Sequence, residues 1–271
     1  MPHKTMPSIL DKILEKKKAR VEAVQKKIPA SELEKGLSDR QQPRNFAGSL
    51  HKKADEKAAI IAEIKRSSPS KGAFARDLCA KDTAKAYEKG GAAAISVLTE
   101  MDFFSGNDGD LVEAHQASAL PVLRKDFIFS PYQVLESAVL QADAILLIAR
   151  ILDPGLLKDL AAQAEEFGMD VLFEINDLGE IPAVLAAKPK ILGINNRDLA
   201  SFHTDIFLAP RLAAELPESL IPVALSGIRS AEDILATRKQ GIHSFLVGEA
   251  LVTSKNPASF LEELALAGKK P

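Results

Sequence analysis

Short apolar runs recur along the chain from residue 58 onward, and this rhythm constrains the fold more than any other feature. The runs begin near Ile60, Ala93, Pro121, Ala144, Asp170, Ile191, Ile221 and Ser244, at intervals of 21 to 33 residues. Helix-like segments lie between and after them, at 82–89, 109–117, 131–140, 154–167, 178–186, 207–215, 230–239 and 257–267. Several of these segments open on helix-start signals, such as Ser130-Pro131 and Asp153-Pro154. Strands and helices that alternate in this way predict eight βα units.

Eight βα units close naturally into a barrel, which usually takes about 250 residues. The alternative is an open doubly wound sheet, which normally carries a glycine-rich dinucleotide loop after its first strand. Here the first apolar run is followed by KRSSPSKG, which does not match that loop. We therefore expect an α/β protein with a (β/α)8 TIM barrel over residues 58–271.

The first 57 residues lie outside the repeat and predict a helical extension that covers the barrel within one domain overall. Residues 8–28 place apolar side chains at helical spacing after Ser8, a residue type that favours the N-cap. A second short helix is expected over 31–37, because Ser31 and Glu34 match a capping box. The polar stretch 38–46 then reads as a connector.

Composition excludes several classes of function. The 271 residues carry 37 acidic side chains and 35 Lys+Arg, a net charge of −2, which argues against bulk binding to nucleic acid or to an anionic membrane. A single cysteine leaves no disulfide framework and no cysteine zinc site, and no metal is expected. No apolar run is long enough for a signal peptide or a membrane span, so we expect a cytoplasmic protein. A monomer is expected as well.

Polar residues that interrupt the apolar runs mark the place where chemistry is expected, because barrel active sites lie at the C-terminal ends of the strands. Glu63 and Lys65 are two apart and share one face of the first strand, Lys125 ends the third, and Glu174 lies on the fifth. Alternate strands fill a barrel in layers, so these four charges could share one layer. An internal salt-bridge network is the alternative explanation. The sixth strand adds Asn195, Asn196 and Arg197.

Small residues stand at the ends of the seventh and eighth strands, namely Ser226-Gly227 and Gly248, the latter followed by Glu249. Glycine lets backbone N–H groups approach an anion, and barrels often bind phosphate after these two strands. The glycines could also be ordinary turns. Together with inward lysines they favour a small, anionic, phosphorylated substrate.

Six segments resemble indole-3-glycerol-phosphate synthase of tryptophan biosynthesis, namely IIAEIKRSSPSKG, PVLRKDFIFSPYQV, ILLIARIL, LFEIND, ILGINNRDL and FLVGEAL. The likeness covers nearly the whole chain and includes the N-terminal helical segment of that family. It implies a carboxy-lyase that needs no cofactor. The implied reaction converts 1-(2-carboxyphenylamino)-1-deoxyribulose 5-phosphate to indole-3-glycerol phosphate, with release of carbon dioxide and water.

The resemblance also implies a role for each matching residue. Lys125 would be the general acid for ring closure, Glu174 would transfer protons during dehydration, and Lys65 would contact the substrate carboxylate or act as a second acid. Glu63 and Asn195 would orient these groups. The residues implied in binding phosphate are Ser67, Gly227, Gly248 and Glu249, with Ser226 beside them. Those implied around the rest of the substrate are Arg197, Leu199, Phe127 and Pro69.

One position departs from the family pattern. The family usually has glutamate just before the Ser-Gly pair of the seventh strand, whereas this chain reads VALSG, with Leu225 at that place. Loss of one negative charge beside the lysines predicts slower turnover. Leu225 keeps one alternative open, a catalytically impaired phosphate-binding barrel. A second alternative is a phosphoribosylanthranilate isomerase-like barrel of the same class. The second would need neither the N-terminal helix nor the Lys65/Lys125 pair.

Overall fold

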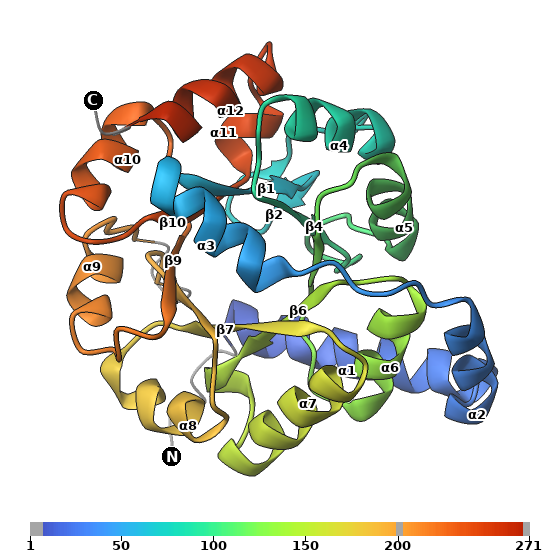
Figure 1. The fold of residues 1–271 in the computed structure, drawn as a ribbon. Helices are drawn as coiled ribbons and strands as arrows, with labels where there is room; N and C mark the ends of the chain where they lie inside the picture. The colour runs from blue at the N-terminus through green and yellow to red at the C-terminus, as the bar shows by residue number, and fades with distance from the viewer. Residues whose placement is uncertain (1–7, 199–202, 268–271) are drawn as a thin grey trace, which may run out of the picture.

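In the computed structural model, which describes residues 8–198 and 203–267, parallel strands close into a barrel (Figure 1). Within these residues the barrel has eight strands, in the order β1-β10-β9-β8-β7-β6-β5-β4. They are β1 (Ala59–Ile64), β4 (Ala94–Leu98), β5 (Val122–Lys125), β6 (Ala144–Ile148), β7 (Asp170–Ile175), β8 (Ile191–Asn195), β9 (Ile221–Leu225) and β10 (Ser244–Val247). The eight apolar runs of the sequence therefore begin within one residue of the eight strands, and the predicted (β/α)8 fold is confirmed.

Helices follow the strands on the outside of the barrel (Figure 1). They are α4 (Ala80–Lys89), α5 (Asp108–Ala117), α6 (Pro131–Val139), α7 (Pro154–Glu166), α8 (Ile181–Ala186), α9 (Leu208–Ala213), α10 (Ala231–Arg238), α11 (Glu249–Val252) and α12 (Pro257–Leu266). Two 3-10 turns, η2 (Ala149–Ile151) and η3 (Leu178–Glu180), and a small hairpin of β2 (Ser67–Ser68) and β3 (Gly72–Ala73) complete the connections. No helix in the described part of the chain is both long and apolar enough to cross a membrane.

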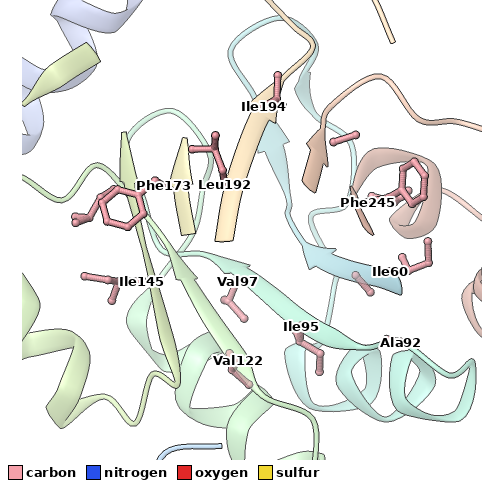
Figure 2. Close-up of a cluster of buried hydrophobic side chains, with 14 of the residues drawn as sticks. Ile60, Ala92, Ile95, Val97, Val122, Ile145, Phe173, Leu192, Ile194 and Phe245 are labelled. Carbon is pink, nitrogen blue, oxygen red and sulfur yellow. The ribbon is translucent and has the colours of Figure 1, made fainter. Parts of the chain in front are cut away.

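Each strand has an outward and an inward face, because successive side chains point to opposite sides. Outward residues such as Ile95, Val97 and Phe245 pack under the helices and form the larger core cluster (Figure 2). Inward residues such as Ile61 and Leu123 form a second cluster inside the barrel. This alternation continues to the strand ends, so Glu63, Lys125 and Glu174 take the inward parity of Ile61, Leu123 and Leu172.

The helix α3 (Phe46–Glu56) closes the barrel at the N-terminal ends of the strands, and the sequence analysis did not foresee it (Figure 1). It starts with Asn45 Oδ1 accepting a hydrogen bond of 2.7 Å from the Gly48 amide. Phe46 and Leu50 are fully buried among the inward barrel residues. The inward core is thus completed by a segment that precedes the first strand.

The second predicted helix is shorter than expected and begins differently. The structure has α2 (Ala30–Leu33) followed by a 3-10 turn, η1 (Glu34–Asp39). Pro29 stands at the N-cap, and no side chain caps the helix. Ser31 therefore lies inside the first turn of α2 and not at its N-cap. The predicted capping box of Ser31 and Glu34 is wrong.

The first helix, α1 (Ile9–Lys27), matches its prediction and lies at the opposite end of the barrel from α3. Ser8 caps it in a capping box with Asp11. Its buried side chains are Ile13, Lys17 and Val21. This helix covers the C-terminal ends of the strands, where the functional site is expected.

Candidate active site

A cavity of about 290 Å³ opens at the C-terminal ends of the strands, beneath α1. Its polar wall comes from the strand ends and its apolar wall from α1 and the loops after β4 and β5. Nearly all the residues that the sequence singled out as a site meet here: Glu63, Lys65, Pro69, Lys125, Phe127, Glu174, Asn195, Arg197, Ser226, Gly227, Gly248 and Glu249. The topology places them together because parallel strands bring all their carboxyl ends to one rim.

Glu63 is the centre of the charged wall. Its Oε1 lies 2.7 Å from Lys65 Nζ and its Oε2 lies 2.7 Å from Lys125 Nζ, so one carboxylate pairs with two ammonium groups. Only 1% of Glu63 is exposed. Burial would raise its pKa, but Lys125 and Lys65 outweigh burial and lower the pKa to about 2. The salt-bridge network considered from the sequence does exist, and it faces the cavity.

Lys125 is held in its charged form by this arrangement. Burial favours the neutral amine, but Glu63 and then Glu174 outweigh it and raise the lysine pKa above its ordinary value. The ammonium is thus a partly buried, charged donor at neutral pH, on the strand end that faces the cavity.

Glu174 differs from Glu63 in its surroundings. It is also buried, and it accepts one side-chain hydrogen bond of 2.9 Å from Asn195 Nδ2. Burial dominates over the attraction of Lys125, so the pKa of Glu174 is raised. The site therefore holds two carboxylates pushed in opposite directions, which suits one of them to carry charge and the other to exchange protons.

The pairing of Glu63 predicts a pH-dependent contribution to stability. Because its pKa is lower in the folded chain than in the unfolded one, Glu63 stabilises the fold above pH 4.5 and loses this effect as the pH falls toward 2. Glu63→Gln removes the carboxylate that Lys65 and Lys125 share, and we expect it to lower Tm by about 5–10 °C at pH 7. The difference in Tm should shrink steadily below pH 4.5. Circular dichroism melts from pH 2.5 to 7 measure it, with exposed Glu166→Gln as the control; a pH-independent difference would contradict the pairing.

Backbone geometry shapes the other end of the cavity. Ser226 and Gly227 both have positive φ angles, 66° and 88°. A Cβ on Gly227 would lie 2.6 Å from the Thr204 side chain, and one on Gly248 would lie 2.3 Å from Glu63 Oε1. Both glycines are therefore needed for close packing around the cavity, whatever ligand it binds.

The hairpin that follows β1 reaches across this end. Lys71 pairs with Glu249, and Ser70 Oγ accepts a hydrogen bond of 3.2 Å from Arg197. The side chain of Glu249 thus contacts the loop after β1.

Two predicted positions, Ser67 and Leu225, stand apart from the cavity wall, and a third lies outside the described residues. The Ser67 hydroxyl donates to the Phe103 carbonyl at 3.1 Å and lies 3.0 Å from Ser105 Oγ, so it joins the loops after β1 and β4. Leu225 is buried in the inward core, beside Asn195 in the register of β8 and β9. Leu199 lies outside the described residues.

Sequence reasoning missed part of the apolar wall. Ile9, Leu10 and Ile13 of α1 line the cavity together with Phe104, which follows β4. The Phe104 and Phe127 rings lie 6.2 Å apart in a tilted arrangement. The apolar stripe of α1 was visible in the sequence, but which of its residues reach the cavity depends on how the helix docks. Among the described residues, no group of three His, Cys, Asp or Glu is placed to hold a metal ion.

Comparisons with known proteins agree with this geometry. A sequence model of the family described as "Indole-3-glycerol phosphate synthase" matches residues 10–264. The chain is 47% identical to the indole-3-glycerol phosphate synthase of Desulfosudis oleivorans, over 96% of this chain and 99% of that protein. It is 42% identical to the protein of the same name from Variovorax paradoxus, over 96% and 99%, and 44% identical to that of Rhodopirellula baltica, over 90% and 94%.

The chain belongs to the indole-3-glycerol phosphate synthase family. The matched range runs from α1 through α12, so family membership covers the N-terminal helix as well as the barrel.

Solved structures outside the family share the barrel alone. A thiamine phosphate pyrophosphorylase from Pyrococcus furiosus matches with a TM-score of 0.57 at 15% identity, covering 81% of this chain and 96% of that one. An N-acetylmannosamine-6-phosphate 2-epimerase from Clostridium perfringens matches with a TM-score of 0.56 at 16% identity, over 73% and 89%. At this identity the likeness is one of fold.

Proposed function

We propose that this chain is an indole-3-glycerol phosphate synthase, which closes the indole ring of 1-(2-carboxyphenylamino)-1-deoxyribulose 5-phosphate with loss of carbon dioxide and water. The observation that carries the proposal is the pair of partly buried lysines that share Glu63 in a cavity that Glu174 also lines. Such a site offers a charged proton donor and a carboxylate proton acceptor to one bound substrate.

Ring closure is the first step that the site must catalyse. Attack of the aromatic ring on the ketone places negative charge on the ketone oxygen, and a positioned acid must supply a proton there. Lys125 is proposed as this acid, since its ammonium is charged and faces the cavity. Lys65 is proposed to hold the substrate carboxylate until it leaves as carbon dioxide, and Glu63 to keep both ammonium groups in place.

Dehydration is the second step. The hydroxyl must leave with a proton as water. The six-membered ring has by then regained its aromaticity by losing carbon dioxide, and the new five-membered ring becomes aromatic by losing another proton. Glu174 is proposed to accept that second proton, because its raised pKa makes it a better base than an ordinary carboxylate. Asn195, which donates to Glu174, is proposed to orient it.

Substrate binding would divide between the two ends of the cavity. Phe127, Pro69 and the α1 residues are proposed to hold the aromatic ring, and Arg197 and Leu199 to complete the site. The phosphate is proposed to bind at the backbone of Ser226, Gly227, Gly248 and Glu249. Ser67 would contribute only indirectly, because its hydroxyl is occupied by the loop after β4.

The assay for this function has low background, because the chain contains no tryptophan. Adding the carboxyphenylamino-deoxyribulose phosphate should produce indole fluorescence at a rate proportional to enzyme concentration. Folded protein that yields no indole product would overturn the proposal. Turnover of phosphoribosylanthranilate without an indole product would instead support the isomerase-like alternative.

Leu225 favours a second candidate, a barrel of the same family with impaired catalysis, and a direct substitution tests this. Leu225→Glu would place a carboxylate beside Asn195, next to Gly193, which has no side chain to block it. One charge-assisted hydrogen bond to the substrate corresponds to about a tenfold rise in kcat/KM. Leu225→Gln, of the same shape but neutral, is the matched control. An unchanged or lower kcat/KM in folded Leu225→Glu would contradict a catalytic cost of leucine at this position.

We further propose that residues 1–57 and the barrel from residue 58 act as one unit, a cytoplasmic monomer without a nucleic-acid partner. Support comes from the cavity, whose wall combines α1 with the strand ends, and from α3, whose Phe46 and Leu50 belong to the barrel's inner core. The net charge of −2 and the family's small phosphorylated substrate fit the same picture.

A further inference from the structure

The helix α1 carries one buried charge, Lys17, which the proposed mechanism does not use. Its side chain is only 6% exposed, and Nζ lies 2.6 Å from Asp126 Oδ2. The partner carboxylate is completely buried, although the two residues are 109 positions apart in the sequence. Removing a lysine ammonium from water is costly, so a pair of this kind needs good geometry and further hydrogen bonds.

Asp126 has those further hydrogen bonds. The same Oδ2 accepts a bond of 2.7 Å from the Thr99 hydroxyl and a longer one of 3.4 Å from Arg124 Nη2. Its other oxygen, Oδ1, accepts a bond of 2.8 Å from the Phe127 amide. Burial raises the pKa of Asp126, but Lys17 and Arg124 outweigh it, and the net pKa is lowered. The carboxylate is therefore charged and held from several sides.

The position of Asp126 in the chain connects this network to the cavity. It lies directly between Lys125, which faces the cavity, and Phe127, which lines it. A carboxylate fixed on one side by α1 and on the other by the Phe127 amide determines how the chain leaves β5. That turn sets the direction of both neighbours.

The other links between α1 and the barrel are weaker. Arg20 pairs with Asp102 at 2.9 Å, but these side chains are 38% and 20% exposed. Exposed pairs contribute little, typically below about 1 kcal/mol. Lys16 stands 5.5 Å above the Phe103 ring, and Tyr132 donates a hydrogen bond of 2.9 Å to the Ile28 carbonyl just after the helix. Of these contacts, the one made by Lys17 is with Asp126, which directly follows Lys125 at the end of β5.

We propose that Lys17 is a positioning residue for the reaction. Through Asp126 it fixes the end of β5, and with it the ammonium of Lys125 and the ring of Phe127, while it holds Ile9 and Ile13 against the cavity. This inference rests on the proposed function. It assigns to α1 a part in placing the general acid, beyond covering the cavity.

The test compares Lys17→Met with Lys18→Met, the same substitution at the next, exposed position. In the indole assay, Lys17→Met should lower kcat about 10- to 100-fold, because small displacements of catalytic groups cost rates of this size. KM should change less than kcat, and Lys18→Met should match the parent. Lys17→Arg keeps the charge and should recover part of the lost kcat.

A second measurement separates positioning from simple stabilisation. Hydrogen exchange at 25 °C, well below Tm, should show faster exchange of the Phe127 amide in Lys17→Met than in Lys18→Met. A Lys17→Met protein with a lower Tm but a parent-like kcat and parent-like Phe127 exchange would overturn the inference. If Lys17→Met does not fold, Lys17→Gln carries the same comparison. An inactive parent would overturn the proposed function, whereas parent-like kcat in the variant overturns only the role of Lys17.

Discussion

Lys125→Met is expected to lower kcat for indole formation by about 10²- to 10⁴-fold, the range that a positioned general acid contributes. Methionine keeps a long, unbranched side chain at the end of β5 but has no proton to give to the ketone oxygen. The change in Tm should be small relative to the loss of kcat, because the substitution also removes the partly buried charge of Lys125. KM should rise only modestly, since the phosphate and ring contacts are proposed for other residues. Steady-state kinetics at pH 7.5 give both parameters.

The control for this variant is Lys158→Met, an exposed lysine on α7 away from the cavity. It should keep the parent kcat within about twofold, as surface substitutions usually do. If Lys125→Met folds and loses less than tenfold in kcat, Lys125 is not the general acid. Lys65, on the other side of Glu63, would then be the next residue to test.

Glu174→Gln should lower kcat by about 10²- to 10⁴-fold and also change the pH profile. The glutamine keeps the shape and can still bond to Asn195, but it cannot accept a proton. In the parent, Glu174 works as a base only when ionised, so kcat falls as the pH drops toward its pKa. That pKa is raised by burial, which places the acid limb of the profile above the ordinary value of 4.5.

The alkaline side of the profile follows from Lys125. Its pKa is raised, so the ammonium stays charged beyond the ordinary lysine value, and loss of this acid should not limit kcat between pH 7 and 9. Glu174→Gln should lack the acid limb altogether. Exposed Glu166→Gln should keep it. A residual Glu174→Gln activity with the parent's acid limb would assign that limb to another group.

The sequence was informative where the signal was local or periodic. The spacing of apolar runs predicted where strands begin, because each βα unit must return the chain to the same end of the barrel. Parity predicted that Glu63, Lys125 and Glu174 face inward, because side chains alternate strictly along a strand. Those two regularities brought the charged residues of the cavity wall together, whereas Pro69 and Phe127 were implied by the family resemblance.

Other features depend on contacts between distant segments, which periodicity does not encode. The Ser67 hydroxyl is directed by a carbonyl 36 positions away. Nothing in the sequence pattern identifies Lys17 as the partner of Asp126, because the two residues are 109 positions apart. The sequence did not predict α3 because this helix precedes the βα repeat. Outside the repeat, the sequence of a helix that closes a barrel resembles that of a surface helix.

The way α3 closes the barrel has a consequence for how the chain is made. Phe46 and Leu50 leave the ribosome early, yet the inner core that covers them includes Val223 and Leu246, close to the other end of the chain. The ring itself closes only when β10 pairs with β1. During synthesis these two apolar side chains therefore lack some of their native neighbours until nearly the whole chain has emerged. A segment that is translated early is thus among the last to complete its packing.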